Sequence, residues 1–81
     1  MPRYFMHLRD GTDIALDEEG LLVDDEDALR AAALVSARDV LSSDARNGTL
    51  DLRLRIDAED EDGRVVLTLP FSDAIEVRYP A

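Results

Sequence analysis

Leucine and isoleucine alternate with charged residues over residues 50–57, and this pattern restricts the fold more than any other part of the sequence. Four apolar side chains would share one face of an extended chain: Leu50, Leu52, Leu54 and Ile56. Four charged side chains would share the opposite face: Asp51, Arg53, Arg55 and Asp57. One dry face and one charged face are typical of an antiparallel sheet that is covered on a single side. The pattern therefore predicts a half-solvated sheet that needs a second layer.

A one-sided helix before this strand is expected to supply that layer. Residues 28–41 contain no Gly or Pro and are rich in Ala, the strongest helix former. Asp24 or Asp25 is placed to cap the N-terminus, and Asn47-Gly48 is a typical helix stop. The apolar residues that share one sector of the helix are Leu29, Ala33, Leu34, Ala37, Val40 and Leu41.

Turn signals divide the rest of the chain into shorter extended segments. Arg3–Arg9 predicts a first strand, and Asp10-Gly11 predicts a hairpin into a short second strand at Thr12–Leu16. Leu21–Val23 predicts a brief extended stretch before the helix. These segments place two strands before the helix.

The acidic loop Glu59–Gly63 separates the charged strand from a last strand at Arg64–Leu69, which Pro70 ends because proline has no N–H. Beyond it, Phe71, Ile75 and Val77 are expected to cover the end of the core. The order ββαββ predicts an α+β fold, in which an antiparallel four-stranded sheet carries one helix on one face. At 81 residues, the whole chain, residues 1–81, is expected to form a single small domain.

Composition excludes several classes of function. The chain has 9 basic and 19 acidic residues and a formal charge of −10, so polyanions such as nucleic acid or an anionic membrane surface would be repelled. No cysteine is present, which removes disulfides, thiolate metal sites and cysteine nucleophiles. No signal-peptide or membrane-spanning pattern occurs, and a cytoplasmic location is expected.

No motif predicts a catalytic, cofactor, metal or small-molecule site. His7 is the one histidine, and its spacing assigns it neither a nucleophile nor an orienting partner. The acidic clusters fail the calcium-loop pattern: with Gly63 at the sixth position, Ala58 and Leu69 occupy the first and twelfth. Solvated turns and a helix N-terminus account for these clusters.

A single helix covers one face of the predicted sheet, and the other face is the predicted interaction surface. Its residues are Phe5, His7, Arg53, Arg55, Val66 and Thr68. A second copy of the chain or another protein would cover this face or extend an edge strand, so we expect a homodimer or a protein partner. The alternative is a regulatory or antitoxin-like protein whose acidic surface occupies a basic partner.

The chain resembles a family of short bacterial proteins, common in alphaproteobacteria and described as a domain of unknown function. The residues that carry the likeness are the start Pro2-Arg3-Tyr4-Phe5-Met6-His7-Leu8-Arg9-Asp10-Gly11, the turn at residues 17–20, the Ala-rich helix and the close at residues 67–74. The start fits the pattern Pro-Arg-Tyr-Phe-x-His-x-Arg-x-Gly, although Met6 replaces the aromatic residue that is usual there. The resemblance implies no activity, cofactor or partner.

Overall fold

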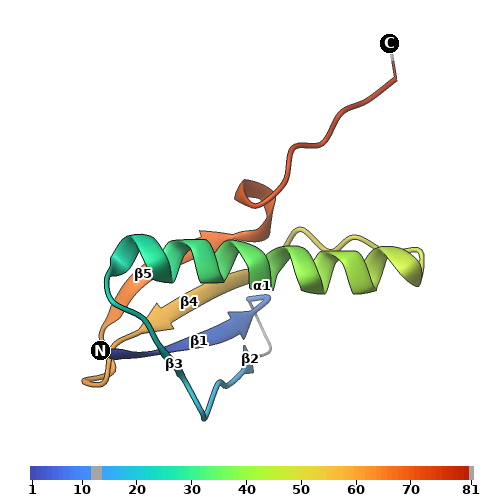
Figure 1. Cartoon of the computed structure of the whole chain (residues 1–81). Helices are drawn as coiled ribbons and strands as arrows, with labels where there is room; N and C mark the ends of the chain where they lie inside the picture. The colour runs from blue at the N-terminus through green and yellow to red at the C-terminus, as the bar shows by residue number, and fades with distance from the viewer. Residues whose placement is uncertain (12–13, 81) are drawn as a thin grey trace.

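Five strands and one long helix form the regular structure in the computed structural model, which describes residues 1–11 and 14–80 (Figure 1). In chain order the elements are β1 (Arg3–Arg9), β2 (Ile14–Ala15), β3 (Leu21–Leu22), α1 (Glu26–Arg46), β4 (Arg55–Glu59), β5 (Val65–Pro70) and the short 3₁₀ helix η1 (Phe71–Asp73). The predicted α+β class and single helix are confirmed.

The sheet is antiparallel throughout and has five strands rather than the predicted four. Its main order is β2-β1-β4-β5, and β3 pairs separately with β1. The brief extended stretch predicted at Leu21–Val23 is therefore a sheet strand at Leu21–Leu22, and the element order is βββαββ. Of the predicted strand Thr12–Leu16, Ile14–Ala15 is β2, while Thr12 lies outside the described residues.

The chain between β2 and β3 makes an excursion away from the β1 ladder. Ala15 pairs with Leu8 and Leu21 pairs with Tyr4, so residues 16–20 lie opposite only residues 5–7. The extra length cannot stay in register, and the segment leaves the ladder as a bulge. This bulge positions the residues described in the next subsection.

Local sequence signals fix both ends of α1. The Asp25 side chain accepts the N–H of Ala28 at 2.8 Å, which satisfies one of the amides in the first turn. At the other end, Asn47 and Gly48 close the last turn with backbone bonds to Asp44 and Ala45. The buried side chains of the helix are Leu29, Ala33, Ala37 and Leu41. The predicted apolar sector is thus confirmed.

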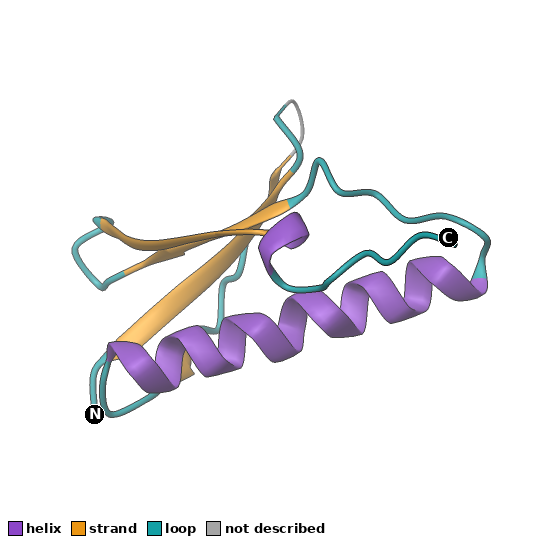
Figure 2. Ribbon diagram, turned by 90° about the horizontal axis from the view of Figure 1, so that it is seen from above, coloured by secondary structure: helices purple, strands orange, loops and turns teal. Residues whose placement is uncertain are grey.

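The helix covers one face of the sheet, and a small apolar core fills the space between the two layers (Figure 2). The helix contributes mostly alanines, which let it approach the sheet closely. The larger buried residues Ile56, Leu69 and Phe71 come from β4, β5 and η1, and Ala74 follows η1. Phe71 is fully buried, as the sequence predicted, whereas Val77 is exposed and takes no part in the core.

The strand predicted from residue 50 begins only at Arg55, and this corrects the strongest sequence signal. Leu50 is 53% exposed and Leu52 is 38% exposed, outside the core. Both neighbouring strands end at this level, since Arg55 pairs with Arg9 and with Pro70. Beyond it β1 has turned away and Pro70 offers no N–H. An extended chain there would have no ladder to join, so residues 50–54 form a turn and a short connection.

The helix outreaches the sheet. Its 21 residues span about 31 Å at ~1.5 Å per residue, whereas the five residues of β4 span about 17 Å. The C-terminal part of α1 therefore extends past the strands, and the chain returns alongside it through residues 49–54 (Figures 1 and 2). The chain after η1 runs out as an extended segment away from the sheet and helix (Figure 1).

Candidate functional site

The sheet face turned away from α1 carries a continuous group of polar side chains. The register between β1 and β4 builds it, because His7 lies opposite Asp57 and Arg9 lies opposite Arg55. β5 adds Thr68, which also lies opposite Asp57. We call this group the polar network; its members are His7, Arg9, Arg55, Asp57, Glu59 and Thr68.

His7 is held by the chain through both ring nitrogens. Nδ1 accepts the backbone N–H of Asp17 at 3.1 Å, and Nε2 lies 3.4 Å from Glu59 Oε2. An Nδ1 that accepts a hydrogen bond leaves the proton of a neutral imidazole on Nε2, where it faces the Glu59 carboxylate. The residue is only 8% exposed. This geometry is that of a structural histidine, because neither nitrogen is left to act on a substrate.

Asp57 is the centre of the network and is 6% exposed. Thr68 Oγ1 donates to its Oδ1 at 2.9 Å, and Arg55 Nε donates to its Oδ2 at 3.3 Å. Arg9 Nε lies 3.4 Å from the same Oδ2. The two arginines balance the carboxylates of Asp57 and Glu59, so this buried charge is paired within the chain. Removal of any one partner would destabilise the fold, since the remaining charge would stay buried and uncompensated.

The segment between β2 and β3 closes over part of this face. The Asp17 carboxylate accepts three backbone N–H groups, those of Met6, Glu19 and Gly20. Burial alone would raise the pKa of Asp17, but these hydrogen bonds, led by the one from Gly20, outweigh it and hold that pKa below its usual value. The ionised carboxylate thus fastens residues 16–20 to β1.

Gly20 lies against the aromatic ring of Phe5. A Cβ at this position would come within 2.9 Å of Arg3 Cγ and 3.0 Å of both Phe5 Cε1 and the Tyr4 carbonyl oxygen, and the residue has a φ of +77°. Only glycine meets both conditions without strain. The predicted open face is therefore partly covered over Phe5 and His7 by the chain itself.

The six residues of the predicted interaction face do not all lie together. Phe5, His7, Arg55 and Thr68 lie on the face away from α1. Val66 falls at a β-bulge, since Ala58 pairs with Leu67 and the next pair is Glu59 with Val65. Its position on the face, inferred from simple alternation, is displaced by this irregularity.

Arg53 is not on the sheet at all, which corrects its assignment to the interaction face. It lies in the turn before β4, where its guanidinium donates to Asp51 at 3.0 and 2.9 Å. The side-chain hydrogen bond from Arg53 lowers the pKa of Asp51. Arg53 is absent from the sheet because the ladder ends at Arg55, which leaves Arg53 and Asp51 in a local turn.

Two members of the site escaped the sequence interpretation. Glu59 was assigned to the acidic loop, although the alternation Arg55, Asp57, Glu59 continues to it and marks the same face. Asp17 was assigned to a solvated turn, and the signal was its spacing from Gly20, which is typical of a carboxylate that caps its own turn. Their contact with β1 depends on the register of three strands.

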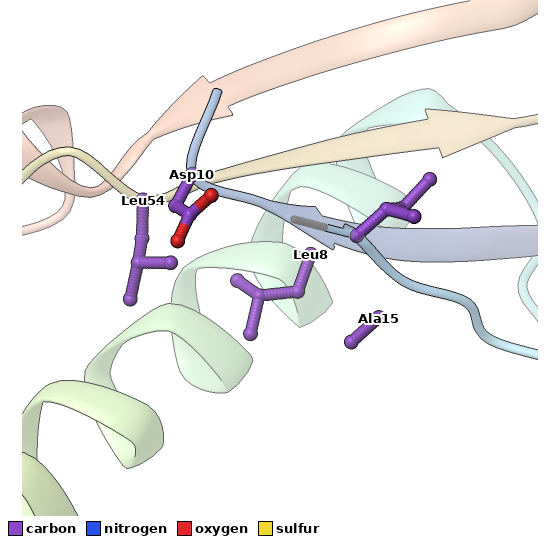
Figure 3. A pocket seen from close by; sticks show the side chains of 5 residues that line it. Leu8, Asp10, Ala15 and Leu54 are labelled. Atoms are coloured by element: carbon purple, nitrogen blue, oxygen red, sulfur yellow. The ribbon is translucent and has the colours of Figure 1, made fainter. Parts of the chain in front are cut away.

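A shallow groove lies at the C-terminal end of β1, between the sheet and the part of α1 that extends past the strands (Figure 3). It is lined by Leu8, Asp10, Ile14, Ala15 and Leu54 and has a volume of about 210 Å³. Ligand sites usually measure roughly 300–1,000 Å³ and enclose the ligand, so this groove suits one side chain of a partner better than a small molecule.

Two further apolar side chains are exposed in the return segment that leads to Leu54. Leu50 and Leu52 precede Leu54 in the return segment and are not covered by the sheet. We call Leu50, Leu52 and the apolar groove residues the apolar end. Exposed apolar side chains that form a continuous patch are typical of a protein contact.

Acidic residues gather at the other end of the molecule. Arg3 connects two acidic segments there, because its backbone N–H donates to Glu61 Oε1 and its guanidinium donates to the Glu19 carbonyl oxygen. The N-terminus of α1 starts at the same end (Figure 1). We call this region the acidic end; its acidic residues are Glu18, Glu19, Asp24–Asp27 and Glu59–Asp62.

Within residues 1–11 and 14–80, no group of three or more His, Asp or Glu side chains is arranged to hold a metal ion. The same part of the chain contains no helix with the length and apolar character needed to cross a membrane.

Comparison with curated proteins and with solved structures found no match. The family model described as a domain of unknown function, DUF6894, matches residues 3–72. This span runs from the first residue of β1 into η1, so it includes every residue of the polar network and of the groove. The chain therefore belongs to the DUF6894 family.

Proposed function

We propose that this chain is a non-enzymatic protein-interaction domain that contacts its partner, a second copy or another protein, through the apolar end. The observation that carries the proposal is the exposure of Leu50 and Leu52 in the segment that leads to Leu54, together with the groove that Ile14 and Leu54 line. A partner that covers this apolar area would gain about 25 cal/mol of favourable free energy for each Å² removed from water.

The state of the polar network supports a binding role over catalysis. His7 uses both ring nitrogens within the chain, and Asp57 is surrounded by Thr68 and two arginines. A catalytic histidine needs a nitrogen directed at a substrate within a pocket. The charged side chains of this face instead pair with one another and hold the strands and residues 16–20 together.

This proposal moves the contact surface away from the sheet face predicted from the sequence. Phe5 and His7 are partly covered by residues 16–20, and the charges around them are paired. The homodimer or protein partner, and the cytoplasmic location, stay predictions.

A photo-crosslinking amino acid at Leu52 tests the proposal, with the same amino acid at Val35 as the matched control. Val35 is also exposed but lies on the side of α1 away from the core residues Ala33 and Ala37. We expect a discrete protein adduct from position 52 and none from position 35. Equal labelling at both positions, or no adduct at position 52 in cells that naturally make the protein, contradicts the proposal.

The arrangement of the acidic end favours a second function, in which the domain occupies a basic partner. Three acidic segments lie there, and Arg3 joins two of them through Glu19 and Glu61. Binding at this end would weaken as salt rises, because the interaction is between exposed charges. Binding at the apolar end would hold or strengthen. Titration with a basic protein at two salt concentrations distinguishes the two functions.

A further inference from the structure

We infer that the groove at the apolar end receives the C-terminal segment of a second copy of this chain, and that two copies exchange these segments. The inference rests on the proposed function and names its partner. It makes the protein a dimer in which residues 76–80 of each copy cross to the other.

The C-terminal segment has the form of a strand without a neighbour. After η1 the chain runs extended and leaves the body of the molecule (Figure 1). Ile75 still packs against the core, whereas Val77 is 47% and Tyr79 is 84% exposed. Between them Glu76 and Arg78 pair with each other at 3.1 Å. The segment therefore offers alternating apolar side chains and no net charge.

The groove offers what this segment lacks. Leu8, Ala15 and Leu54 point toward the space between the sheet and α1 (Figure 3). Its volume of about 210 Å³ equals that of roughly seven water molecules at ~30 Å³ each, enough for one aromatic ring. β2 forms the end of the main sheet order, so an incoming extended chain can also lie along a strand edge. Tyr79 is the aromatic residue of the segment that is free to enter.

The connections of the chain favour a groove on another copy over its own. Phe71 N donates to the Leu54 carbonyl oxygen at 2.9 Å, so the segment starts close to the groove. It leaves, however, on the β5 side of Leu54, whereas the groove lies on the β1–β2 side (Figures 1 and 3). The five residues after Ile75 extend about 17 Å at ~3.3 Å each, a span suited to a copy placed end to end. A two-fold axis there satisfies both segments and both grooves at once.

The charge distribution permits this pairing despite a net charge of −10. The acidic end lies at the start of β1 and the groove lies at the end of β1, so an end-to-end dimer holds the two acidic ends far apart. Each chain measures 45 Å along its longest axis. Charge repulsion is screened over about 8 Å at physiological salt, which leaves little repulsion between the acidic ends.

Sedimentation equilibrium tests the exchange on the full chain. We expect wild type to dimerise and the double variant Val77→Ser/Tyr79→Ser to raise the dimer dissociation constant at least tenfold. Ile14→Ser, on the groove, is expected to act in the same direction, and Val35→Ser, the matched control, to change it less than twofold. Rising salt should leave the wild-type dimer intact or tighten it.

Introduced cysteines identify the occupant, since the natural chain has none. A mixture of Ile14→Cys and Tyr79→Cys chains should form a disulfide-linked pair on mild oxidation, faster than Val35→Cys mixed with Tyr79→Cys. Dimers that survive the tail variant, or equal rates of linkage, overturn the exchange.

Failure of the inference is distinguishable from failure of the proposed function. A wild-type monomer that still gives an adduct with a different protein from position 52 overturns the second copy and leaves the interaction domain standing. A second outcome also overturns the exchange. If wild type is a monomer and a chain that carries both Ile14→Cys and Tyr79→Cys forms an internal disulfide, the segment occupies its own groove. Loss of the adduct at position 52 overturns both.

Discussion

The Asp17 backbone N–H donates to His7 Nδ1 at 3.1 Å, and the Asp17 carboxylate accepts the N–H of Met6, the residue before His7 on β1, also at 3.1 Å. One residue thus gives a hydrogen bond to β1 and takes one from it. Because the bonds run in both directions, residues 16–20 are fixed against the strand without a regular ladder. Three predictions about stability concern this segment and the face beneath it, one concerns the start of α1, and one concerns the start of β4.

Gly20→Ala is expected to destabilise the protein by more than Gly48→Ala. Both glycines have positive φ, +77° and +83°, so each alanine adds about 1 kcal/mol or more of backbone strain. A Cβ at Gly20 also meets Arg3 and the Tyr4 carbonyl oxygen, whereas one at Gly48 meets nothing within 4 Å. Urea unfolding should place the difference at about 1–3 kcal/mol, the usual range for overpacking. Equal losses of stability for the two variants would contradict the close packing around Gly20.

Asp17→Asn should lower stability at neutral pH and lower it less in acid. The pKa of Asp17 is held below its usual value in the folded chain, so its carboxylate contributes stability that is present above the unfolded pKa. That contribution disappears as pH falls through the folded pKa, below about 4. Unfolding measured at pH 7 and at pH 3 should show a smaller gap between wild type and variant at pH 3. A gap that is constant with pH argues that the carboxylate is not stabilised by its backbone donors.

His7→Ala is expected to cost about 2–4 kcal/mol, because a nearly buried ring is lost and the Asp17 N–H loses its acceptor. Glu59→Gln is the matched control, since it changes the contact at Nε2 and leaves the His7 Nδ1 that accepts from Asp17 in place. Amide exchange should show faster exchange at Asp17 in His7→Ala and unchanged exchange in the control. Protection of that amide in both variants would contradict the hydrogen bond.

Asp25→Ala should weaken α1 by about 1 kcal/mol, whereas Asp24→Ala should have a smaller effect. The two substitutions remove the same charge beside the same helix end, but only Asp25 accepts the Ala28 N–H, at 2.8 Å. Thermal unfolding followed by circular dichroism separates them. A larger loss of stability for Asp24→Ala would show that Asp25 is not the residue that caps α1.

Ile56→Ala is expected to cost about 2–5 kcal/mol, and Leu52→Ala less than about 0.5 kcal/mol in dilute solution. The two residues have the same place in the sequence alternation, yet Ile56 is buried in β4 and Leu52 lies in a turn. Similar losses in urea unfolding would show that the strand starts earlier than Arg55.

Local signals made much of the fold predictable. The cap at Asp25, the alanine-rich sector and the Asn47-Gly48 stop identify α1, and alternation identifies β1. These signals act over a few residues, and nothing elsewhere in the fold opposes them. Phe71 was likewise predictable as a core residue, because a large aromatic after Pro70 has the sheet end to cover.

The start of β4 was not predictable from alternation alone. The pattern at residues 50–57 is uniform, but a strand needs neighbours, and both end at the level of Arg55. The site was equally incomplete from sequence, since the contact of Asp17 with His7 depends on a two-residue excess between β2 and β3. Register and strand length come from the assembled sheet.

The internal pairing of the polar network has a consequence for how this chain can evolve. Asp57 and His7 are buried and are held by hydrogen bonds within the chain, so these two polar side chains need no partner protein to pair them. Leu50, Leu52 and Tyr79 are exposed and lie outside the core, so substitutions there should change the proposed contact while the fold stays the same.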